Sequence, residues 1–292
     1  MARRLDLHGW AELPGIAERG EGWALVLADC LETLEKLAPQ SVDLIFADPP
    51  YLLSNGGTTC QSGRRVRVDK GDWDASRGIE SDHAFHRSWL AACRRVLKPS
   101  GTLWVSGTQH VIFSVGYAMQ ELGFHLLNTV TWYKPNAAPN LACRFFTHST
   151  EILLWAAPAR SKPLAHRFNY RDMKERNGGK QMRDLWEVSE RPEPGGEQVV
   201  WALPTPGPRE KLLGRHPTQK PYALLERVIA SSSSPNDLVV DPFSGSGTTG
   251  VAATVAGRRF LGVERDERYL QLAARRIRAA VDGPPLLRAA SR

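Results

Sequence analysis

Short apolar runs alternate with amphipathic segments along the first half of the chain, which is the pattern of an α/β protein. Residues 23–27 and 42–47 are predicted strands, and the apolar positions between them recur at helical spacing, at Leu31, Leu34 and Leu37. The second run is almost wholly apolar, as is typical of a strand buried on both faces of a parallel sheet. It ends at Asp48-Pro49-Pro50-Tyr51, because proline cannot donate a hydrogen bond to a neighbouring strand.

The same alternation continues further along the chain. Before residue 157 we expect a helix over residues 82–97, closed by Lys98-Pro99-Ser100-Gly101, and strands over residues 102–106, 126–132 and 151–156. After residue 214 we expect a helix over residues 221–230, a loop over 231–234, a strand over 238–241, a helix ending near residue 256 and a strand over 259–264. These elements predict one α/β sheet.

Two segments interrupt the pattern. Residues 52–80 contain several glycines and a basic cluster but no periodicity, and they are too long for an ordinary connection, so we expect a functional loop. Residues 158–213 are rich in proline and charge, and they look like an inserted module. The predicted organisation is therefore 20–157 and 214–280 as two halves of one domain, 158–213 as an insert and 281–292 as a tail.

Charge suggests a polyanionic partner. The chain of 292 residues has a formal net charge of +7, although net charge alone is weak evidence for nucleic-acid binding. The excess is concentrated in the two irregular segments, at residues 160–215 and at Arg64, Arg65, Arg67 and Lys70.

No apolar run reaches the roughly 18 residues of a membrane span, and the N-terminus lacks the apolar stretch of a signal peptide. We therefore expect a cytoplasmic protein with no membrane partner. The four cysteines are far apart, without a C-x-x-C pair, so we expect reduced thiols and no metal site.

A glycine-rich turn joins the predicted strand 238–241 to the next helix. Glycines let the backbone approach a ligand closely, and the free N–H groups of a helix start favour polar or anionic groups. Glu264, at the end of the following strand, is placed to accept hydrogen bonds from ribose hydroxyls. Gly245, Gly247 and Gly250 also spell G-x-G-x-x-G, so a nicotinamide dehydrogenase has to be weighed. Only about 45 residues follow, too few for the second half of a dinucleotide-binding fold, which favours a mononucleoside-sized cofactor.

The tetrapeptide Asp48–Tyr51 follows a buried strand, where open α/β sheets place their ligands. An amine on an aromatic base is a poor nucleophile, because its lone pair is delocalised into the ring. A carboxylate and a rigid carbonyl that accept both N–H hydrogens would expose that lone pair, and Asp48 and the Pro49 carbonyl can fill these roles. Tyr51 can stack on the face of the base.

The motifs D-P-P-Y at residues 48–51, H-P-T-Q-K-P at 216–221 and D-P-F-S-G-S-G-T-T at 241–249 resemble those of the DNA amino-methyltransferases of restriction-modification systems. Their order is that of the beta group. The resemblance implies S-adenosylmethionine as methyl donor and double-stranded DNA as substrate. It also implies the class I S-adenosylmethionine-dependent methyltransferase fold: a mostly parallel seven-stranded sheet with one antiparallel strand, helices on both faces, a circularly permuted motif order and an inserted target-recognition region at 158–213.

The resemblance also implies roles for individual residues. Asp48, Pro49, Pro50 and Tyr51 would be catalytic, and Glu264 would hold the ribose of the cofactor. The remaining cofactor-binding residues would be Asp29 and Cys30 near the adenine, His216, Thr218 and Lys220 toward the methionine end, and Asp241, Pro242, Phe243, Ser244, Gly245, Ser246, Gly247 and Thr248 in the turn. Lys134 and Asn136 resemble the family's stretch on the target-base side, and with Arg64, Arg65, Arg67 and Lys70 they would contact DNA.

Several alternatives are weighed against this interpretation. Carbon-5 methylation of cytosine needs a cysteine after a proline, which the chain lacks, and relatives that act on RNA or on protein glutamine typically have Asn where Asp48 stands. An RNA methyltransferase, a nicotinamide oxidoreductase and a catalytically silent DNA-binding protein remain as alternatives. Among target amines, the Asp-led tetrapeptide favours adenine N6, whereas the arginine-rich composition is a weak hint of cytosine N4. A homodimer and a cognate restriction endonuclease are further partners that the sequence leaves open.

Overall fold

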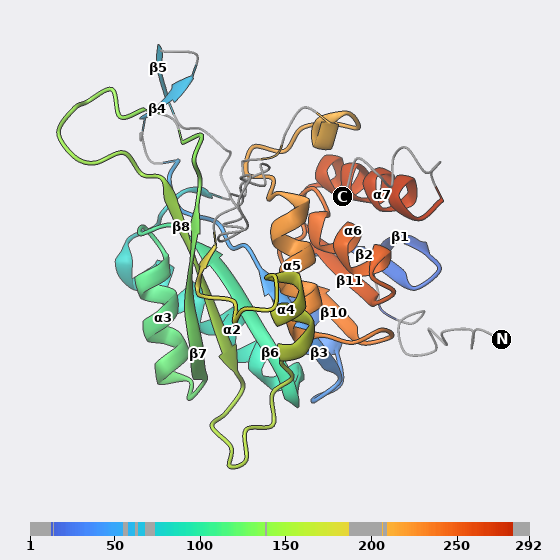
Figure 1. Ribbon diagram of the computed structural model, residues 1–292. Coiled ribbons are helices and arrows are strands. Elements are labelled where there is room, and N and C mark those ends of the chain that lie inside the picture. The colour runs from blue at the N-terminus through green and yellow to red at the C-terminus, as the bar shows by residue number, and fades with distance from the viewer. Residues whose placement is uncertain are drawn as a thin grey trace.

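One nine-stranded sheet organises the protein. The computed structural model describes residues 13, 15–54, 58–61, 64–67, 74–137, 139–186, 206 and 209–282 (Figure 1). The strands of this sheet are β1 (Ile16–Gly20), β2 (Trp23–Leu27), β3 (Val42–Ala47), β6 (Leu97–Gly107), β7 (His125–Tyr133), β8 (Thr150–Ala157), β9 (Leu185–Trp186), β10 (Leu238–Asp241) and β11 (Arg259–Glu264). A separate hairpin consists of β4 (Thr58–Gln61) and β5 (Arg64–Arg67).

The strand order is β1-β2-β11-β10-β3-β6-β8-β7-β9. From β2 to β6 all neighbours are parallel, whereas β8 is antiparallel to both β6 and β7. The seven strands from β2 to β7 in this order confirm the predicted seven-stranded sheet with one reversed strand. Two additions extend it, since β1 pairs antiparallel with β2 and the two-residue β9 pairs parallel with β7.

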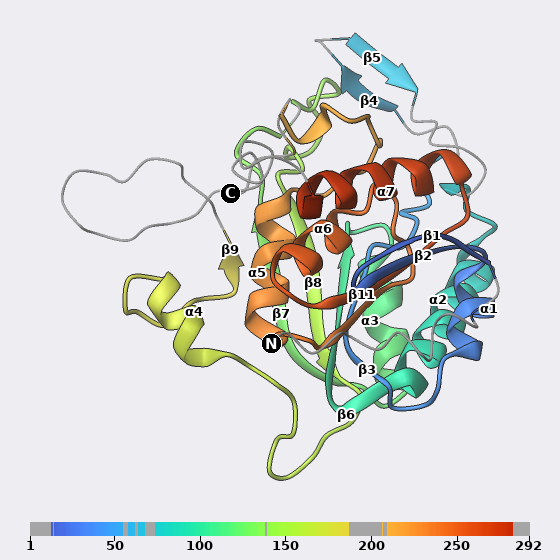
Figure 2. The same ribbon diagram turned by 90° about the vertical axis from the view of Figure 1, so that its right-hand side faces the viewer.

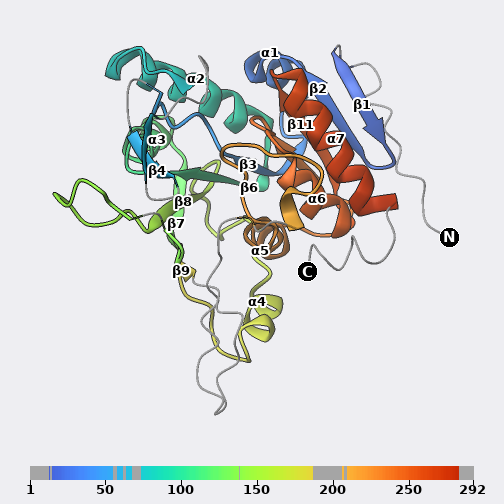
Figure 3. The ribbon, with the colours of Figure 1, turned by 90° about the horizontal axis from the view of Figure 1, so that it is seen from above.

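Helices cover both faces of the sheet, as predicted (Figures 2 and 3). One face is covered by α1 (Cys30–Lys36), α2 (Ile79–Val96) and α3 (Ile112–Glu121). The other face is covered by α5 (Tyr222–Ser232), α6 (Thr248–Val255) and α7 (Glu267–Asp282). Strand side chains alternate between two separate apolar clusters, because successive residues of a strand point to opposite faces. Burial on both faces explains why these strands are continuous apolar runs.

The inserted segment is partly described, and its described part is attached to the sheet. It contains α4 (Tyr170–Arg176) and β9, followed by a short 3-10 helix at Arg209–Lys211. The Trp186 ring lies 5.6 Å from that of Trp104, which stacks on Trp155 at 5.0 Å, and all three tryptophans are buried. These contacts fix the described part of the insert beside the last strands of the sheet.

The structure differs from the predicted elements in a few places. The sequence analysis did not predict β1, β9, α3, α4, α7 or the β4–β5 hairpin, which lies within the loop expected over residues 52–80. The expected turn at Lys98–Gly101 is part of β6, where the β3 pairing shifts register between Val42 and Leu44. Helix α5 continues to Ser232, into the expected loop, because the Ser231 and Ser232 hydroxyls donate to the carbonyl of Val228 instead of breaking the helix. Within the described residues, no helix is both long and apolar enough to cross a membrane.

Candidate active site

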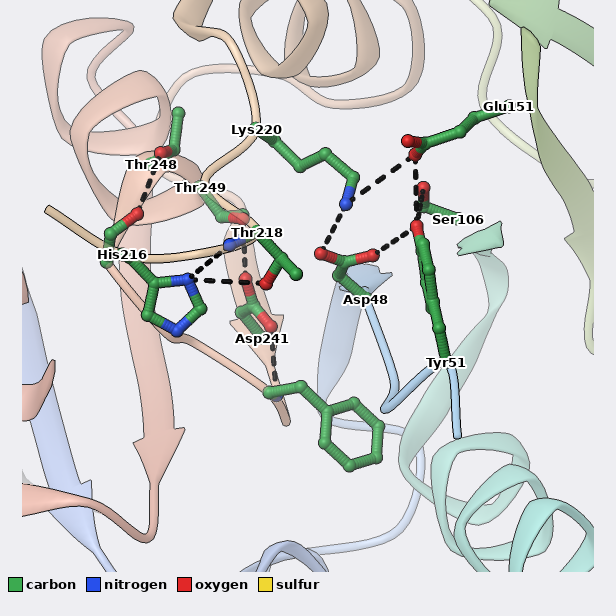
Figure 4. Close-up of polar contacts among 12 residues, drawn as sticks. Asp48, Tyr51, Ser106, Glu151, His216, Thr218, Lys220, Asp241, Thr248 and Thr249 are labelled. Atoms are coloured by element: carbon green, nitrogen blue, oxygen red, sulfur yellow. Dashed lines mark hydrogen bonds and ion pairs between the residues drawn. The ribbon is translucent and has the colours of Figure 1, made fainter. Parts of the chain in front are cut away.

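The predicted catalytic and cofactor motifs lie side by side at one rim of the sheet. Asp48 follows β3 directly, and the glycine turn follows β10, which pairs in parallel with β3. The carboxyl ends of parallel strands meet at the same rim. Because β8 is reversed, its first residues also lie at this rim, and they bring Glu151 beside Tyr51 and Lys220 (Figure 4).

A buried lysine lies against the predicted catalytic carboxylate. Lys220 Nζ donates to Asp48 Oδ2 at 2.5 Å, and the Lys220 side chain is only 7% exposed. The Tyr51 hydroxyl donates to Asp48 Oδ1 at 2.9 Å. Both oxygens of the carboxylate therefore accept a hydrogen bond from the protein.

Glu151 forms the other half of this polar cluster. Its Oε1 accepts from Lys134 Nζ at 2.8 Å, and its Oε2 lies 3.0 Å from the Tyr51 hydroxyl and 3.7 Å from Lys220 Nζ. The same hydroxyl lies 3.1 Å from Ser106 Oγ, at the end of β6. Two carboxylates, two ammonium groups and one phenol thus share a site whose charged side chains are at most 15% exposed.

Burial and charge shift the pKa values in opposite directions across the cluster. Burial raises the pKa of Asp48 above its ordinary value, although the Lys220 ammonium partly offsets this effect. Burial would also raise the pKa of Glu151, but Lys220 and Lys134 together hold it below the usual range. Burial opposes a charged Lys220, yet the two carboxylates raise its pKa. Asp48 is therefore the carboxylate more easily protonated, and Lys220 stays charged.

The backbone after the tetrapeptide is held in an uncommon conformation. Leu52 has φ +58°, in the left-handed region that side chains other than glycine rarely adopt. The fully buried carboxylate of Asp74 accepts hydrogen bonds from the backbone N–H groups of Leu52 and Leu53, at 2.8 and 3.2 Å, and from the Ser54 hydroxyl, at 2.9 Å. Asp74 thus fixes the chain that leaves Tyr51, which keeps Asp48 and Tyr51 in place.

The glycine turn is tied to the end of the next strand. Gly245 (φ +50°) donates its N–H to Glu264 Oε2 at 2.8 Å, and Glu264 Oε1 accepts from the N–H groups of Arg265 and Asp266. Burial raises the pKa of Glu264, which these backbone donors partly offset. Each carboxylate oxygen has two lone pairs. Both lone pairs of Oε1 are used, whereas Oε2 accepts only from Gly245 and can still accept from a ribose hydroxyl.

Asp241 orders the start of this turn through two hydrogen bonds. Its Oδ2 accepts from the Thr249 hydroxyl at 2.5 Å and its Oδ1 from the N–H of Phe243 at 3.0 Å. Burial raises the pKa of Asp241 to about 7. The carboxylate points into the protein and orders the turn, while Pro242 is buried and the Phe243 ring packs edge-on against Trp89 of α2 at 5.4 Å.

The side chains of Ser246 and Thr248 are engaged by α7. Buried Arg276 donates to the Ser246 carbonyl at 2.6 Å, to Ser246 Oγ at 3.0 Å and to Thr248 Oγ1 at 2.9 Å. Gly247 lies close to α7 as well, since a Cβ at this position would be 2.6 Å from Ala273 Cβ. These contacts order the turn, and Ser244, whose buried Oγ makes no hydrogen bond within the described residues, completes it.

The other predicted cofactor residues surround the turn. His216 lies edge-on to Tyr269 at 4.2 Å and next to Gly245, and its Nδ1 accepts from the N–H of Thr218 at 3.3 Å. Asp29 caps α1 by accepting from the N–H of Leu31 at 2.8 Å, and it lies beside Glu264 because β2 and β11 are paired. Cys30 is buried, and burial raises the pKa of its thiol to about 12, so it stays protonated. The glycine turn, with the half-buried carboxylates of Asp29 and Glu264 beside it, fits a nucleoside.

The predicted DNA-binding residues are divided between two segments. Arg64, Arg65 and Arg67 belong to β5, and Lys70 lies outside the described residues. The hairpin and the loop between β7 and β8 both project from the rim that carries Asp48 (Figures 1 and 2). Asn136 is exposed in that loop, whereas Lys134 turns inward to Glu151.

The structure therefore brings together all the described residues of the two predicted sites. It also adds residues that the sequence analysis did not assign: Glu151, Ser106, Asp74 and Arg276. Of these, Glu151 had a detectable signal, because a carboxylate at the start of an otherwise apolar predicted strand is unusual. Asp74 and Arg276 contact residues that are distant in sequence, and no local sequence pattern predicts such contacts.

Comparison with known proteins identifies similar chains. Residues 42–275 match the model of a family described as DNA methylase, of the N6/N4 group. The Type II methyltransferase M2.LlaDCHI of Lactococcus lactis subsp. cremoris is 49% identical over 257 residues, which cover 88% of this chain and 90% of the relative. The Type II methyltransferase M2.DpnII of Streptococcus pneumoniae is 49% identical over 255 residues, or 87% and 89% of the two chains.

Solved structures share the architecture. The M1.HpyAVI–SAM complex has a TM-score of 0.57 and 25% identity, covering 87% of this chain and 98% of that one. The PvuII DNA methyltransferase, described as cytosine-N4-specific, has a TM-score of 0.65 and 18% identity, covering 92% and 96%. The second likeness indicates a common fold alone.

Proposed function

The chain belongs to the N6/N4 family of DNA methylases, and from this premise we propose that it methylates the exocyclic N6 amine of adenine within a specific site of double-stranded DNA. The fold and the methyl donor, S-adenosylmethionine, are those of the family. The observation that supports the assigned chemistry is the position of Asp48, whose carboxylate lies at the rim of the sheet beside the glycine turn.

S-adenosylmethionine supplies an electrophilic methyl group. Asp48 and the Pro49 carbonyl are proposed to accept the two N–H hydrogens of the target amine, which draws its nitrogen toward tetrahedral geometry and exposes the lone pair. As the nitrogen gains the methyl group, the bond between that methyl and the sulfonium sulfur of the donor would break and release S-adenosylhomocysteine. The nitrogen then loses one proton. Asp48 is proposed to receive this proton, because its carboxylate accepts a hydrogen bond from the amine and burial raises its pKa above the ordinary value.

The amine is unreachable inside the duplex, so the base must leave the stack. We propose that two segments at the rim bind the DNA around it. One is the β4–β5 hairpin with Arg64, Arg65 and Arg67. The other is the loop of residues 134–149, in which Phe145 and Phe146 are 58% and 95% exposed next to Arg144. Exposed aromatic rings beside a cation stack on unpaired bases.

The insert at residues 158–213 is proposed to read the recognition sequence. Its described part is anchored through Trp186 to Trp104, beside the strands that carry the catalytic cluster. Base edges are read by side chains held on such a rigid support. The roles of the individual site residues, the homodimer, the cognate endonuclease and the cytoplasmic location stay predictions.

Adenine N6 and cytosine N4 are both amines next to a ring nitrogen, and Asp48 with the Pro49 carbonyl suits either. The Asp-led tetrapeptide supports adenine, whereas the 29 arginines among 38 basic residues hint at cytosine through the composition of GC-rich genomes. DNA methylated by the purified protein is digested to nucleosides and analysed by mass spectrometry. We expect N6-methyladenine, and N4-methylcytosine without N6-methyladenine would overturn the choice.

A further inference from the structure

Lys220 lies between two carboxylates and contacts them unequally. Its Nζ is 2.5 Å from Asp48 Oδ2 and 3.7 Å from Glu151 Oε2 (Figure 4). Glu151 is held independently of Lys220, because its Oε1 accepts from Lys134 at 2.8 Å. In the free enzyme, Lys220 is therefore bound more closely to Asp48, the carboxylate that is proposed to accept a hydrogen bond from the substrate amine.

We propose that Glu151 is a positioning residue that takes Lys220 away from Asp48 when the target amine enters, so that the lysine exchanges between the two carboxylates in each catalytic cycle. This inference rests on the proposed function, in which Asp48 accepts a hydrogen bond from the amine.

The amine cannot displace Lys220 unaided. A charge-assisted hydrogen bond is roughly twice as strong as a neutral one, so a neutral N–H competes poorly with an ammonium at 2.5 Å for Asp48 Oδ2. Lys220 is also only 7% exposed, and a buried ammonium that leaves its partner without finding another is strongly destabilising. Access to Asp48 therefore requires a second acceptor within the protein.

Glu151 meets this requirement with little motion. Bringing Lys220 Nζ from 3.7 Å to an ordinary hydrogen-bond distance of Oε2 takes a shift of about 1 Å. The Tyr51 hydroxyl has a single proton and lies within 3.0 Å of both carboxylates. When Lys220 approaches Glu151 Oε2, the Tyr51 hydroxyl can donate its hydrogen bond to Asp48 Oδ1. Asp48 Oδ2 is then available to accept from the amine.

The exchange also suits the charge that develops during the reaction. Methyl transfer makes the amine nitrogen cationic until it loses its proton. An ammonium on Asp48 would repel that charge, whereas an ammonium on Glu151 lies farther away and is neutralised there. The benefit therefore falls on the rate of methyl transfer and not on cofactor binding.

The test is a double-mutant cycle measured as single-turnover methylation of a DNA duplex. Glu151→Gln should lower the rate about 10- to 100-fold while the dissociation constant for S-adenosylmethionine changes less than about threefold. Glu151→Gln in a Lys220→Met background should cost less than about threefold further, because no ammonium is left to remove from Asp48. Losses that multiply across the two variants would overturn the exchange, since a structural role of Glu151 does not depend on Lys220.

The pH dependence of the rate gives a second readout. Asp48 faces Lys220, Tyr51 and Glu151, and it also feels the charge of Asp241. In Glu151→Gln, Lys220 stays on Asp48 and favours its ionised form. The rise of the rate with pH should therefore occur at lower pH, while the maximal rate is lower than that of the wild type. Lys220→Met should move this rise to higher pH. A rise that stays at its wild-type position in both variants would contradict the proposal.

Controls separate the possible failures. Glu35→Gln, at an exposed position of α1 outside both the polar cluster and the insert, should leave rate and pH profile unchanged. Lys220→Gln replaces Lys220→Met if the latter does not bind S-adenosylmethionine. If Asp48→Ala methylates DNA at the wild-type rate, the proposed function itself fails. If Asp48→Ala is inactive and the losses in the cycle multiply, only the lysine exchange is refuted.

Discussion

Gly245 donates its backbone N–H to Glu264 Oε2 at 2.8 Å, so the glycine turn after β10 is joined directly to the end of β11. The same carboxylate accepts from Arg265 and Asp266 through its other oxygen. The turn and the predicted ribose-binding residue are thus fixed relative to each other before any ligand arrives. Such preorganisation lowers the ordering that cofactor binding requires.

Cofactor binding should therefore stabilise the folded protein. S-adenosylmethionine at about 100 times its dissociation constant should contribute about 2.7 kcal/mol by mass action and raise the melting temperature. NAD should have no effect, because the methyl donor of the family to which the chain belongs is S-adenosylmethionine. Differential scanning fluorimetry measures both, and comparable stabilisation by NAD would reverse the assignment of the cofactor.

Asp48→Ala should abolish most methyl transfer and leave cofactor binding intact, because the carboxylate is proposed to bind the target amine and not the cofactor. A loss of about 100-fold or more is expected when such a hydrogen-bond acceptor is removed. Asp48→Asn should fall between wild type and alanine, since it keeps one acceptor oxygen without the charge. Isothermal titration with S-adenosylmethionine serves as the folding control, and wild-type turnover in Asp48→Ala would refute the mechanism.

Gly247→Ala should damage the cofactor turn. Gly247 has φ +75°, and a Cβ there would lie 2.6 Å from Ala273 Cβ and 2.9 Å from Ala273 Cα. The matched control is Gly257→Ala, at φ +73° with no atom within 4 Å. Both variants lose about 1 to 2 kcal/mol from the left-handed backbone, and Gly247→Ala should lose about 1 to 3 kcal/mol more from overpacking. Chemical denaturation measures the difference, and equal losses would show that α7 yields to the added methyl group.

Alanine at Arg64, Arg65 and Arg67 should weaken the dependence of DNA binding on salt. Each phosphate that the protein no longer neutralises should flatten the slope of log Kd against log salt concentration by about one unit. Including Lys70, as the sequence suggests, adds a fourth position. Lys36→Ala is the control, because it lies at the end of α1, near the start of β3 and thus at the rim opposite Asp48. An unchanged slope in the hairpin variant would mean that the cluster is an ordinary solvated surface.

Asp241 should make the stability of the ligand-free protein pH-dependent. Burial raises its pKa from 3.8 to about 7 in the folded state, so the folded protein binds this proton more tightly than the unfolded chain does. Its stabilising contribution is therefore complete below about pH 4 and is lost as the pH rises through 7, by on the order of 2 kcal/mol between pH 5 and 8.

Asp241→Asn removes this titration. The melting temperature of the variant, relative to wild type, should become more favourable as the pH increases from 5 to 8. Asp172→Asn, at an exposed carboxylate of α4, should show no such trend. A constant difference between Asp241→Asn and wild type across this range would contradict the raised pKa.

Much of the sheet could be predicted because its strands are buried on both faces. Residues 42–47 and 238–241 are apolar except for one aspartate each and lie between turn signals, and both are strands with the predicted bounds. Helix α7 also shows helical spacing at Leu270, Ala273 and Ile277, although the sequence analysis assigned no element after residue 264. This apolar spacing was a usable signal, because burial of one face decides where a helix packs.

The polar cluster was only half predictable. Asp48 stands after a buried strand, where ligands of open sheets are expected, and its motif is local. Glu151 and Lys220 are 103 and 172 positions away from it, and Glu151 lies at the start of its strand, whereas Asp48 follows the end of its own. Only the reversal of β8 brings this residue to the rim. The direction of a strand depends on its partners, which no short window of sequence contains.

The same reversal of β8 also affects how freely the connection between β7 and β8 can change in length. Since β7 ends and β8 begins at one rim, the connection over residues 134–149 returns on itself without crossing the sheet. The entropic cost of closing such a connection grows only with the logarithm of its length, so insertions there reduce the free energy of unfolding only slightly. Residues in this segment can therefore be exchanged or added, which changes what the rim touches, while β3 and β8 keep Asp48 and Glu151 in place.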